Sequence, residues 1–203
     1  MTVYVESNYL LELAFEREQA TDCAGILALA EGGRITLALP AFSVGECFER
    51  LGRRRSRRVN IRESLREEIR ELGRSPTGAP LSGQLRTLSD ALVAGADAEA
   101  HRYDAVLGRL LACATFIPLD ADAIRDSLAA RTTYDLSRQD AIILSCVFAH
   151  LAATTPDRAV FINRNRRDFA NHDIVAALDA RGCALKTEFR AGLAHVTAAL
   201  DSP

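Results

Sequence analysis

The chain has 203 residues, of which 48% are hydrophobic, and this is enough for one substantial core, so we expect a single domain over residues 1–203. A formal net charge of −2 argues against a protein that binds nucleic acid over its whole surface. The five cysteines form no C-x-x-C pair, and no run of about 18 uncharged apolar residues occurs, so a disulfide framework, a zinc site and a membrane span are disfavoured. We expect a cytoplasmic protein with reduced thiols and no secretory signal.

The first part of the chain alternates between strand and helix patterns. Residues 3–5 (VYV) form an apolar run typical of a short strand, and residues 8–31 are helical in pattern, with a break expected near residues 19–22. Two glycines end this helix. Residues 34–39 (RITLAL) predict a second strand, which a proline closes.

A long helical region follows, and it contains most of the chain's clustered positive charge. Residues 41–114 are almost wholly helical in pattern, apart from a loop rich in proline, glycine and serine at residues 74–83. Ten arginines lie between Arg50 and Arg74, including the run RRRSRR at residues 53–58. The guanidinium fork suits phosphate recognition. Glutamates interleave with the later arginines at i,i+3 and i,i+4 spacings, however, and this is equally typical of a solvated helix face.

The remaining elements complete an alternating order of strands and helices. Strands are expected at residues 116–120, 158–163 and 183–187, and helices at residues 121–131, 137–153, 172–182 and 190–200. This order predicts an α/β fold with a mainly parallel sheet and helices on both faces. In such folds, functional sites form at the C-terminal ends of the strands.

Three acidic residues occupy positions that this fold would bring to one edge of the sheet. Glu6 follows the first strand, Glu46 lies one turn into the helix after the second strand, and Asp140 begins the apolar helix. A fourth group follows the strand AVFIN and consists of Asn163, Asn165 and Asp168. Clustered carboxylates repel one another, so proteins retain them mainly where a hard cation such as Mg²⁺ or Mn²⁺ neutralises them. Such a cation activates water for attack on a phosphodiester.

A structural explanation exists for each of these acids. Ser43 and Glu46, and likewise Ser137 and Asp140, have the spacing of a capping box, in which a serine begins a helix and an acid follows three positions later. Glu6 alone is explained equally well as the first-turn acid of the next helix, where the helix dipole favours it. The order of all the motifs together therefore carries more information than any one position.

Four ordered segments resemble the PIN-domain ribonucleases, a family that includes the toxins of many bacterial toxin–antitoxin pairs. The segments are VYVESNYLLEL, LPAFSVGECFERL, LSRQDAIILSCVFAHL and AVFINRNRRDF. They correspond to the family's opening strand and turn, its glutamate-bearing helix, the helix that opens with the third acid, and the late strand with its polar turn. The resemblance implies a three-layer α/β/α domain and a metal-dependent endoribonuclease.

The resemblance also implies roles for individual residues. The catalytic set would be Glu6, Glu46, Asp140 and Asp168; Mg²⁺ or Mn²⁺ would be held by Glu6 and Asp140 with Asn165, and Ser7, Asn8 and Asn163 would support the site. The chain departs from the family pattern in two places at this site. Glu6 stands where Asp is usual, and Asn165 stands at an acidic position.

A third departure is the length of the arginine-rich helical stretch. Residues 52–115 exceed a compact PIN domain, and we expect them to form a helical insertion within it. The insertion is predicted to bind RNA through its arginines, or to mediate contact with a second copy or a cognate antitoxin; the arginines singled out are Arg53, Arg54, Arg57 and Arg58. The alternative function is a PIN-fold module that binds RNA or a protein partner without cleaving. A phosphohydrolase of the haloacid-dehalogenase type is disfavoured, because ESN after the first strand supplies no D-x-D nucleophile.

Overall fold

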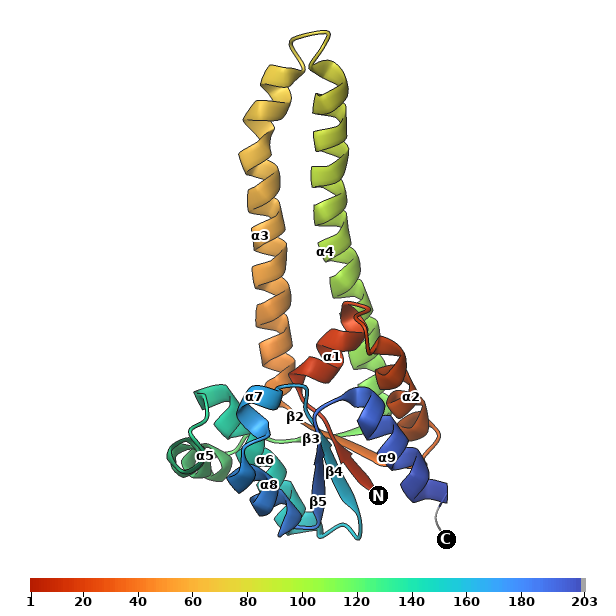
Figure 1. The fold of residues 1–203 in the computed structure, drawn as a ribbon, viewed down its shortest axis with the longest axis vertical. Helices are drawn as coiled ribbons and strands as arrows, with labels where there is room; N and C mark the ends of the chain where they lie inside the picture. The colour runs from red at the N-terminus through yellow and green to blue at the C-terminus, as the bar shows by residue number, and fades with distance from the viewer. Residues whose placement is uncertain (202–203) are drawn as a thin grey trace.

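The computed structural model describes residues 1–201 and shows an α/β protein built on a five-stranded sheet (Figure 1). The strands are β1 (Thr2–Tyr4), β2 (Thr36–Pro40), β3 (Ala114–Ile117), β4 (Ala159–Ile162) and β5 (Cys183–Lys186). Their order is β3-β2-β1-β4-β5, and every neighbouring pair is parallel. The α/β class and the parallel sheet expected from the sequence are therefore confirmed.

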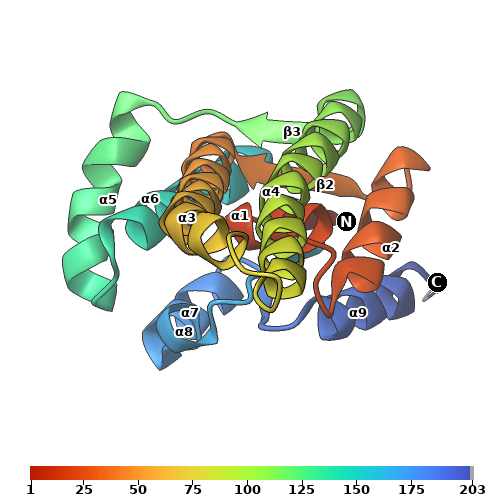
Figure 2. The same ribbon diagram turned by 90° about the horizontal axis from the view of Figure 1, so that it is seen from above.

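The helices of the described chain connect these strands and cover both faces of the sheet. They are α1 (Ser7–Ala14), α2 (Ala20–Glu31), α3 (Phe42–Leu72), α4 (Ala79–Cys113), α5 (Ala121–Tyr134), α6 (Arg138–Thr154), α7 (Arg166–Phe169), α8 (His172–Asp179) and α9 (Phe189–Asp201). Seen from above, α5, α6 and α8 lie on one side of the molecule, and α2 and α9 lie on the other (Figure 2).

Two hydrophobic cores arise because neighbouring residues of a strand point to opposite faces of the sheet. Val3 of β1 packs with residues of α1, α2, α9 and the root of α4. Its neighbour Tyr4 packs on the other face with residues of α5, α6 and α8. The same division continues in the flanking strands, where Val160 belongs to the first core and Phe161 to the second. The two central strands, β1 and β4, are buried along their whole length, as strands covered on both faces require, whereas the edge strands β3 and β5 are partly exposed.

The sheet topology places a crevice beside the central strand. After β1 the chain adds β2 and β3 on one side, and it then returns to the other side of β1 to add β4 and β5. Because all strands are parallel, their C-terminal ends share one edge, and a crevice opens where the order reverses, between β1 and β4. Glu6 follows β1 and Asn163 follows β4, so both residues lie at this point.

The helices α3 and α4 form a long antiparallel hairpin that extends away from the sheet (Figure 1). Buried residues of α4 recur every seven positions, and they are small near the tip and large near the sheet: Ser82, Ser89, Ala96, Tyr103 and Leu110. The small residues let the distal helices approach closely, and Ser82 Oγ donates a hydrogen bond to the Ile69 carbonyl at 2.7 Å. No helix within residues 1–201 is long and apolar enough to cross a membrane.

The segment expected as an insertion has no break at its first boundary. Helix α3 runs without interruption from Phe42, and Tyr103 and Leu110 near the end of α4 are fully buried in the first core. The hairpin root is thus part of the domain, and only its distal portion projects. The loop expected at residues 74–83 is shorter, because α4 begins at Ala79 with Pro80 in its first turn, where proline is well tolerated.

Other boundaries differ by a few residues from those expected. The break in the first helical stretch lies between Ala14 and Ala20 and so begins earlier than residues 19–22. Strand β3 occupies Ala114–Ile117 and ends before Pro118, whereas residues 116–120 were expected. Helix α7 was not predicted, because its four residues are too short to show a helical period.

Candidate active site

Glu6 is a buried carboxylate at the end of the central strand. It occupies the N-cap position of α1 without a side-chain hydrogen bond that caps the helix, so it lies immediately before the first turn in which the helix-dipole explanation would place it. The residue is 3% exposed. Ser7 Oγ donates a hydrogen bond to Glu6 Oε2 at 2.7 Å, while Oε1 is buried with no hydrogen-bond partner in the described part of the chain. Burial raises the pKa of Glu6, and the charge of Asp140 adds to this effect.

Glu46 is close enough to Glu6 for the two carboxylates to interact electrostatically, and it also has a carboxylate oxygen without a hydrogen-bond partner among the residues that the structure describes. Helix α3 begins at Phe42, so Ser43 lies inside the helix and its buried Oγ has no partner among residues 1–201. The predicted capping box of Ser43 and Glu46 is therefore wrong. Glu46 Oε2 is likewise buried and without a partner within the described residues. Burial and then the charge of Glu6 raise the pKa of Glu46 to about 7.

Asp140 combines a structural role with a place in the site. Ser137 Oγ accepts a hydrogen bond from the Asp140 backbone N–H at 3.1 Å and donates one to Asp140 Oδ2 at 2.6 Å. The predicted N-cap at Ser137 is thus confirmed. Burial raises the pKa of Asp140, and the charge of Asp168 raises it further. Asp140 is therefore held by the helix start and also presents a carboxylate to the cleft.

The turn after β4 supplies the amide groups. Asn163 is fully buried, and its Oδ1 accepts a hydrogen bond from the Asn165 backbone N–H at 2.8 Å, which shapes the turn. Asn165 Nδ2 donates to Asp140 Oδ1 at 3.3 Å and to Asp168 Oδ2 at 2.7 Å. Asn165 thereby joins two carboxylates through its amide nitrogen. Asp168 acts on the cleft through Asn165 and does not line it.

A cleft of about 620 Å³ collects most of the predicted site residues at this edge of the sheet. The predicted residues that line it are Glu6, Ser7, Asn8, Glu46, Asp140 and Asn165. Four further polar side chains of the cleft were not predicted as site residues, namely Arg17, Glu18, Gln139 and Arg164, and Arg50 is the first member of the arginine cluster. Arg164 has a recognisable signal in retrospect, because it lies between the two asparagines that follow β4.

The oxygen donors of the cleft fit a hard divalent cation in their chemistry. The unpartnered oxygens of Glu6 and Glu46 are what a carboxylate site without its cation would show, because buried polar atoms in proteins are nearly always paired. Among the described residues, however, no group of three or more His, Cys, Asp or Glu side chains is close enough together to hold a metal ion. A bound cation would therefore draw the carboxylates closer together than they lie here.

The four arginines expected to contact RNA have different surroundings. Arg54 pairs with Glu99 of α4 through two hydrogen bonds, and Arg58 Nη2 lies 2.8 Å from the same carboxylate. Arg53 pairs with Glu49 one turn earlier on α3. Arg57 forms no ion pair with any residue in the range 1–201. Arg54 and Arg58 thus help to join the two helices of the hairpin.

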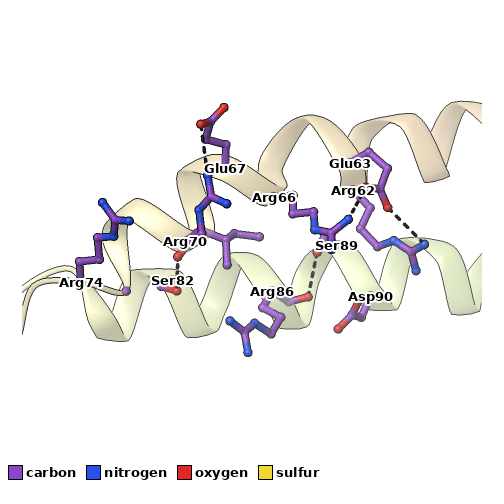
Figure 3. A pocket seen from close by; sticks show the side chains of 12 residues that line it. Arg62, Glu63, Arg66, Glu67, Arg70, Arg74, Ser82, Arg86, Ser89 and Asp90 are labelled. Atoms are coloured by element: carbon purple, nitrogen blue, oxygen red, sulfur yellow. Dashed lines mark hydrogen bonds and ion pairs between the residues drawn. The ribbon is translucent and has the colours of Figure 1, made fainter.

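A larger cavity, of about 970 Å³, lies between α3 and α4 near the hairpin tip and far from the carboxylates (Figure 3). Several of its arginines pair with glutamates three residues earlier on the same helix, such as Arg66 with Glu63 and Arg70 with Glu67. Such exposed pairs contribute little to stability. The cavity carries no constellation of groups that points to catalysis.

Comparisons of the chain with family models, with curated proteins and with solved structures gave no match.

Proposed function

We propose that the chain is a metal-dependent endoribonuclease of the PIN type that hydrolyses RNA phosphodiester bonds in the cleft at the C-terminal end of β1. The observation that carries the proposal is the pair of buried, unpartnered carboxylate oxygens, Glu6 Oε1 and Glu46 Oε2. Both residues line the same cleft as Asp140. Leaving such atoms unpaired costs free energy, and a hard cation bound by both carboxylates would remove this cost.

The roles of the residues follow from their contacts. Glu6, Glu46 and Asp140 would hold Mg²⁺ or Mn²⁺, and Asn165 would complete the site. When bound, the cation supplies an activated water and stabilises negative charge on the phosphate. Ser7 fixes one oxygen of Glu6, and Ser137 fixes one oxygen of Asp140, so each carboxylate is oriented by a hydroxyl donor.

A second candidate is a PIN-fold module that binds RNA or a protein partner and does not cleave. It is favoured by the spacing of the acids, because no three of the described acidic, histidine or cysteine side chains form a preassembled metal group. It is also favoured by Asn165, which stands where the family pattern has an acid and which turns its amide nitrogen toward Asp140.

The cellular role in this proposal is that of a cytoplasmic toxin with a cognate antitoxin, acting as a homodimer. Its support is the resemblance of the four sequence segments to a family rich in such toxins. Expression of the wild-type chain should then arrest growth of a bacterial host, and expression of Glu46→Gln should not. If both proteins arrest growth to the same degree, the toxicity does not depend on the carboxylates of the cleft.

The enzymatic proposal is tested by incubating the purified chain with a labelled RNA in Mn²⁺, in Mg²⁺ and in EDTA. Wild type should cleave only with a divalent cation, and Glu46→Gln should lose at least tenfold in rate. Glu63→Gln is the matched control, because Glu63 lies on the same helix, is exposed, lines neither the cleft nor any cavity next to it, and within residues 1–201 pairs only with Arg62 and Arg66. Absence of cleavage under all conditions, with a folded protein, would favour the non-cleaving module.

A further inference from the structure

The acidic cleft continues into a second cavity that is rich in arginine. This groove has a volume of about 570 Å³ and lies along residues 46–61 of α3, beside α1, the turn after α1 and Leu92 of α4. It shares five lining residues with the acidic cleft, namely Ser7, Glu46, Arg17, Arg50 and Gln139. The two cavities are therefore adjoining parts of one channel, with carboxylates at one end and guanidinium groups at the other.

The arginines of the groove form a row on one face of α3. Arg50, Arg53 and Arg57 are separated by three and four residues, which places them on the same side of the helix. The row extends for about 10 Å along the helix axis, from the seven residues between its ends. Since its first member also lines the acidic cleft, the row leads from the hairpin toward the carboxylates.

The groove has more positive charge than its own acids can neutralise. It is lined by six arginines and two glutamates. Glu99, which lies on α4, forms ion pairs with Arg54 and Arg58, and Glu49 pairs with Arg53. Arg17, Arg50 and Arg57 form no ion pair with any described residue. Three guanidinium groups thus remain to meet an external anion.

One of these three is held in place by an aromatic ring. The Phe15 ring lies 4.7 Å from the Arg17 guanidinium carbon and 4.9 Å from that of Arg54. These cation–π contacts orient both guanidinium groups at the groove and reduce the entropy lost when Arg17 binds a ligand. Because Phe15 is already covered by Arg17 and Arg54, it is not the group on which a nucleotide base would stack.

We propose that this groove binds the sugar–phosphate backbone of one nucleic-acid strand and directs it into the acidic cleft, with Arg17, Arg50 and Arg57 contacting successive phosphates. The proposal rests on the proposed function for its choice of nucleic acid among phosphate-bearing ligands. Arginines in a row with no free aromatic face contact phosphates and carry no base information, so binding is independent of sequence. Without a cation, the carboxylates of the cleft would repel a phosphate. The groove would therefore supply the binding affinity, and the cleft would be the place where the phosphodiester bond is hydrolysed.

The test measures binding in EDTA, so that it does not depend on cleavage. Fluorescence anisotropy with a labelled twelve-nucleotide oligouridylate should give an affinity that falls with salt, at a log–log slope of about −2 for three phosphate contacts. Arg50→Ala and Arg57→Ala should each weaken binding at least threefold at low salt and reduce the slope by about 0.7. Arg74→Ala is the control, because Arg74 is exposed just beyond the distal end of α3 and pairs with Glu71.

Two further binding measurements test whether the groove recognises the sugar–phosphate backbone of a single strand. An oligothymidylate of the same length should bind within about threefold of the RNA, and a duplex of the same length should bind at least tenfold more weakly. The proposal is overturned if Arg74→Ala weakens binding as much as Arg57→Ala, or if the duplex binds as tightly as the single strand. Binding that follows these expectations without any cleavage in Mn²⁺ would support the groove and reject the nuclease, so the two failures are distinguishable.

Discussion

Arg58 of α3 and Glu99 of α4 form an ion pair at which the two helices of the hairpin meet, with 2.8 Å between Arg58 Nη2 and Glu99 Oε1. The two side chains are 16% and 10% exposed, and Arg58 also donates to the Leu92 carbonyl. Arg54 binds the same carboxylate from one turn earlier. This arrangement fixes the register of α3 against α4 at the arginine groove, which Arg54 and Arg58 line.

Glu99→Gln should destabilise the hairpin, because it leaves the largely buried Arg58 without a counter-charge. We expect a loss of about 1–3 kcal/mol in the free energy of unfolding, as for other buried groups deprived of a partner. Urea denaturation measures this loss, and hydrogen exchange should increase in α4 before it increases in the sheet. Glu63→Gln is the control, since Glu63 is exposed and its ion pairs lie along α3. Equal stability of the two variants would contradict the role assigned to Glu99.

The stability of the metal-free protein should fall between pH 5 and pH 7.5. Burial and the charge of Glu6 raise the pKa of Glu46 from its ordinary value of 4.5 to about 7, so the folded state binds a proton over a range in which the unfolded state has released it. The stabilisation is complete below the unfolded pKa and disappears as the pH rises through the folded one. Thermal melts in EDTA should show a smaller pH dependence for Glu46→Gln, and Glu63→Gln, on the distal part of the same helix, should retain the wild-type dependence. A Glu46→Gln melt with the full wild-type dependence would show that Glu46 does not titrate in this range.

The ion pair of Glu12 with Arg164 should determine the position of the turn that carries Asn163 and Asn165. Glu12 Oε2 lies 2.6 Å from Arg164 Nη1, and the Glu12 side chain is only 1% exposed. Glu18 contacts the same nitrogen at 3.3 Å, but its side chain is 78% exposed. Glu12→Gln should therefore cost about 1–3 kcal/mol of stability, whereas Glu18→Gln should cost much less, because solvent screens its exposed ion pair.

Chemical denaturation of the two variants checks this difference. If Glu18→Gln destabilises the protein as much as Glu12→Gln does, the buried partner has no special importance for the turn. A nuclear magnetic resonance spectrum of Glu12→Gln should show the largest shifts in the backbone amides after β4, because Arg164 loses its buried anchor there.

Much of the site could be predicted because it lies at strand ends. Glu6 interrupts an apolar run, and the order of strands then places it beside Asn163 at the shared edge. The capping prediction succeeded at Ser137 and failed at Ser43, although both have the same local spacing. The difference is tertiary, because α3 begins at Phe42 and so encloses Ser43 within the helix.

The roles of individual charges could not be predicted from spacing alone. Arg54, Arg57 and Arg58 belong to one short run, yet Glu99 engages two of them and leaves the third free. Glu99 is more than 40 residues further along the chain, and no local pattern connects it to the arginines. Arg17 was missed for the same reason, since only the corner between α1 and α2 brings it to the cleft.

The most direct test of the central claim is the thermal stability of wild type and of Asp140→Asn, each with and without Mn²⁺. If the carboxylates form a cation site, Asp140→Asn should be more stable than wild type in EDTA, because it removes one of several repelling charges and keeps the Ser137 cap on the backbone N–H. Mn²⁺ should stabilise wild type by about 1.4 kcal/mol at ten times its Kd and should stabilise the variant less. A variant that loses up to about 1 kcal/mol in EDTA, with Mn²⁺ affecting neither protein, would show that Asp140 is a helix cap and that the cleft holds no cation.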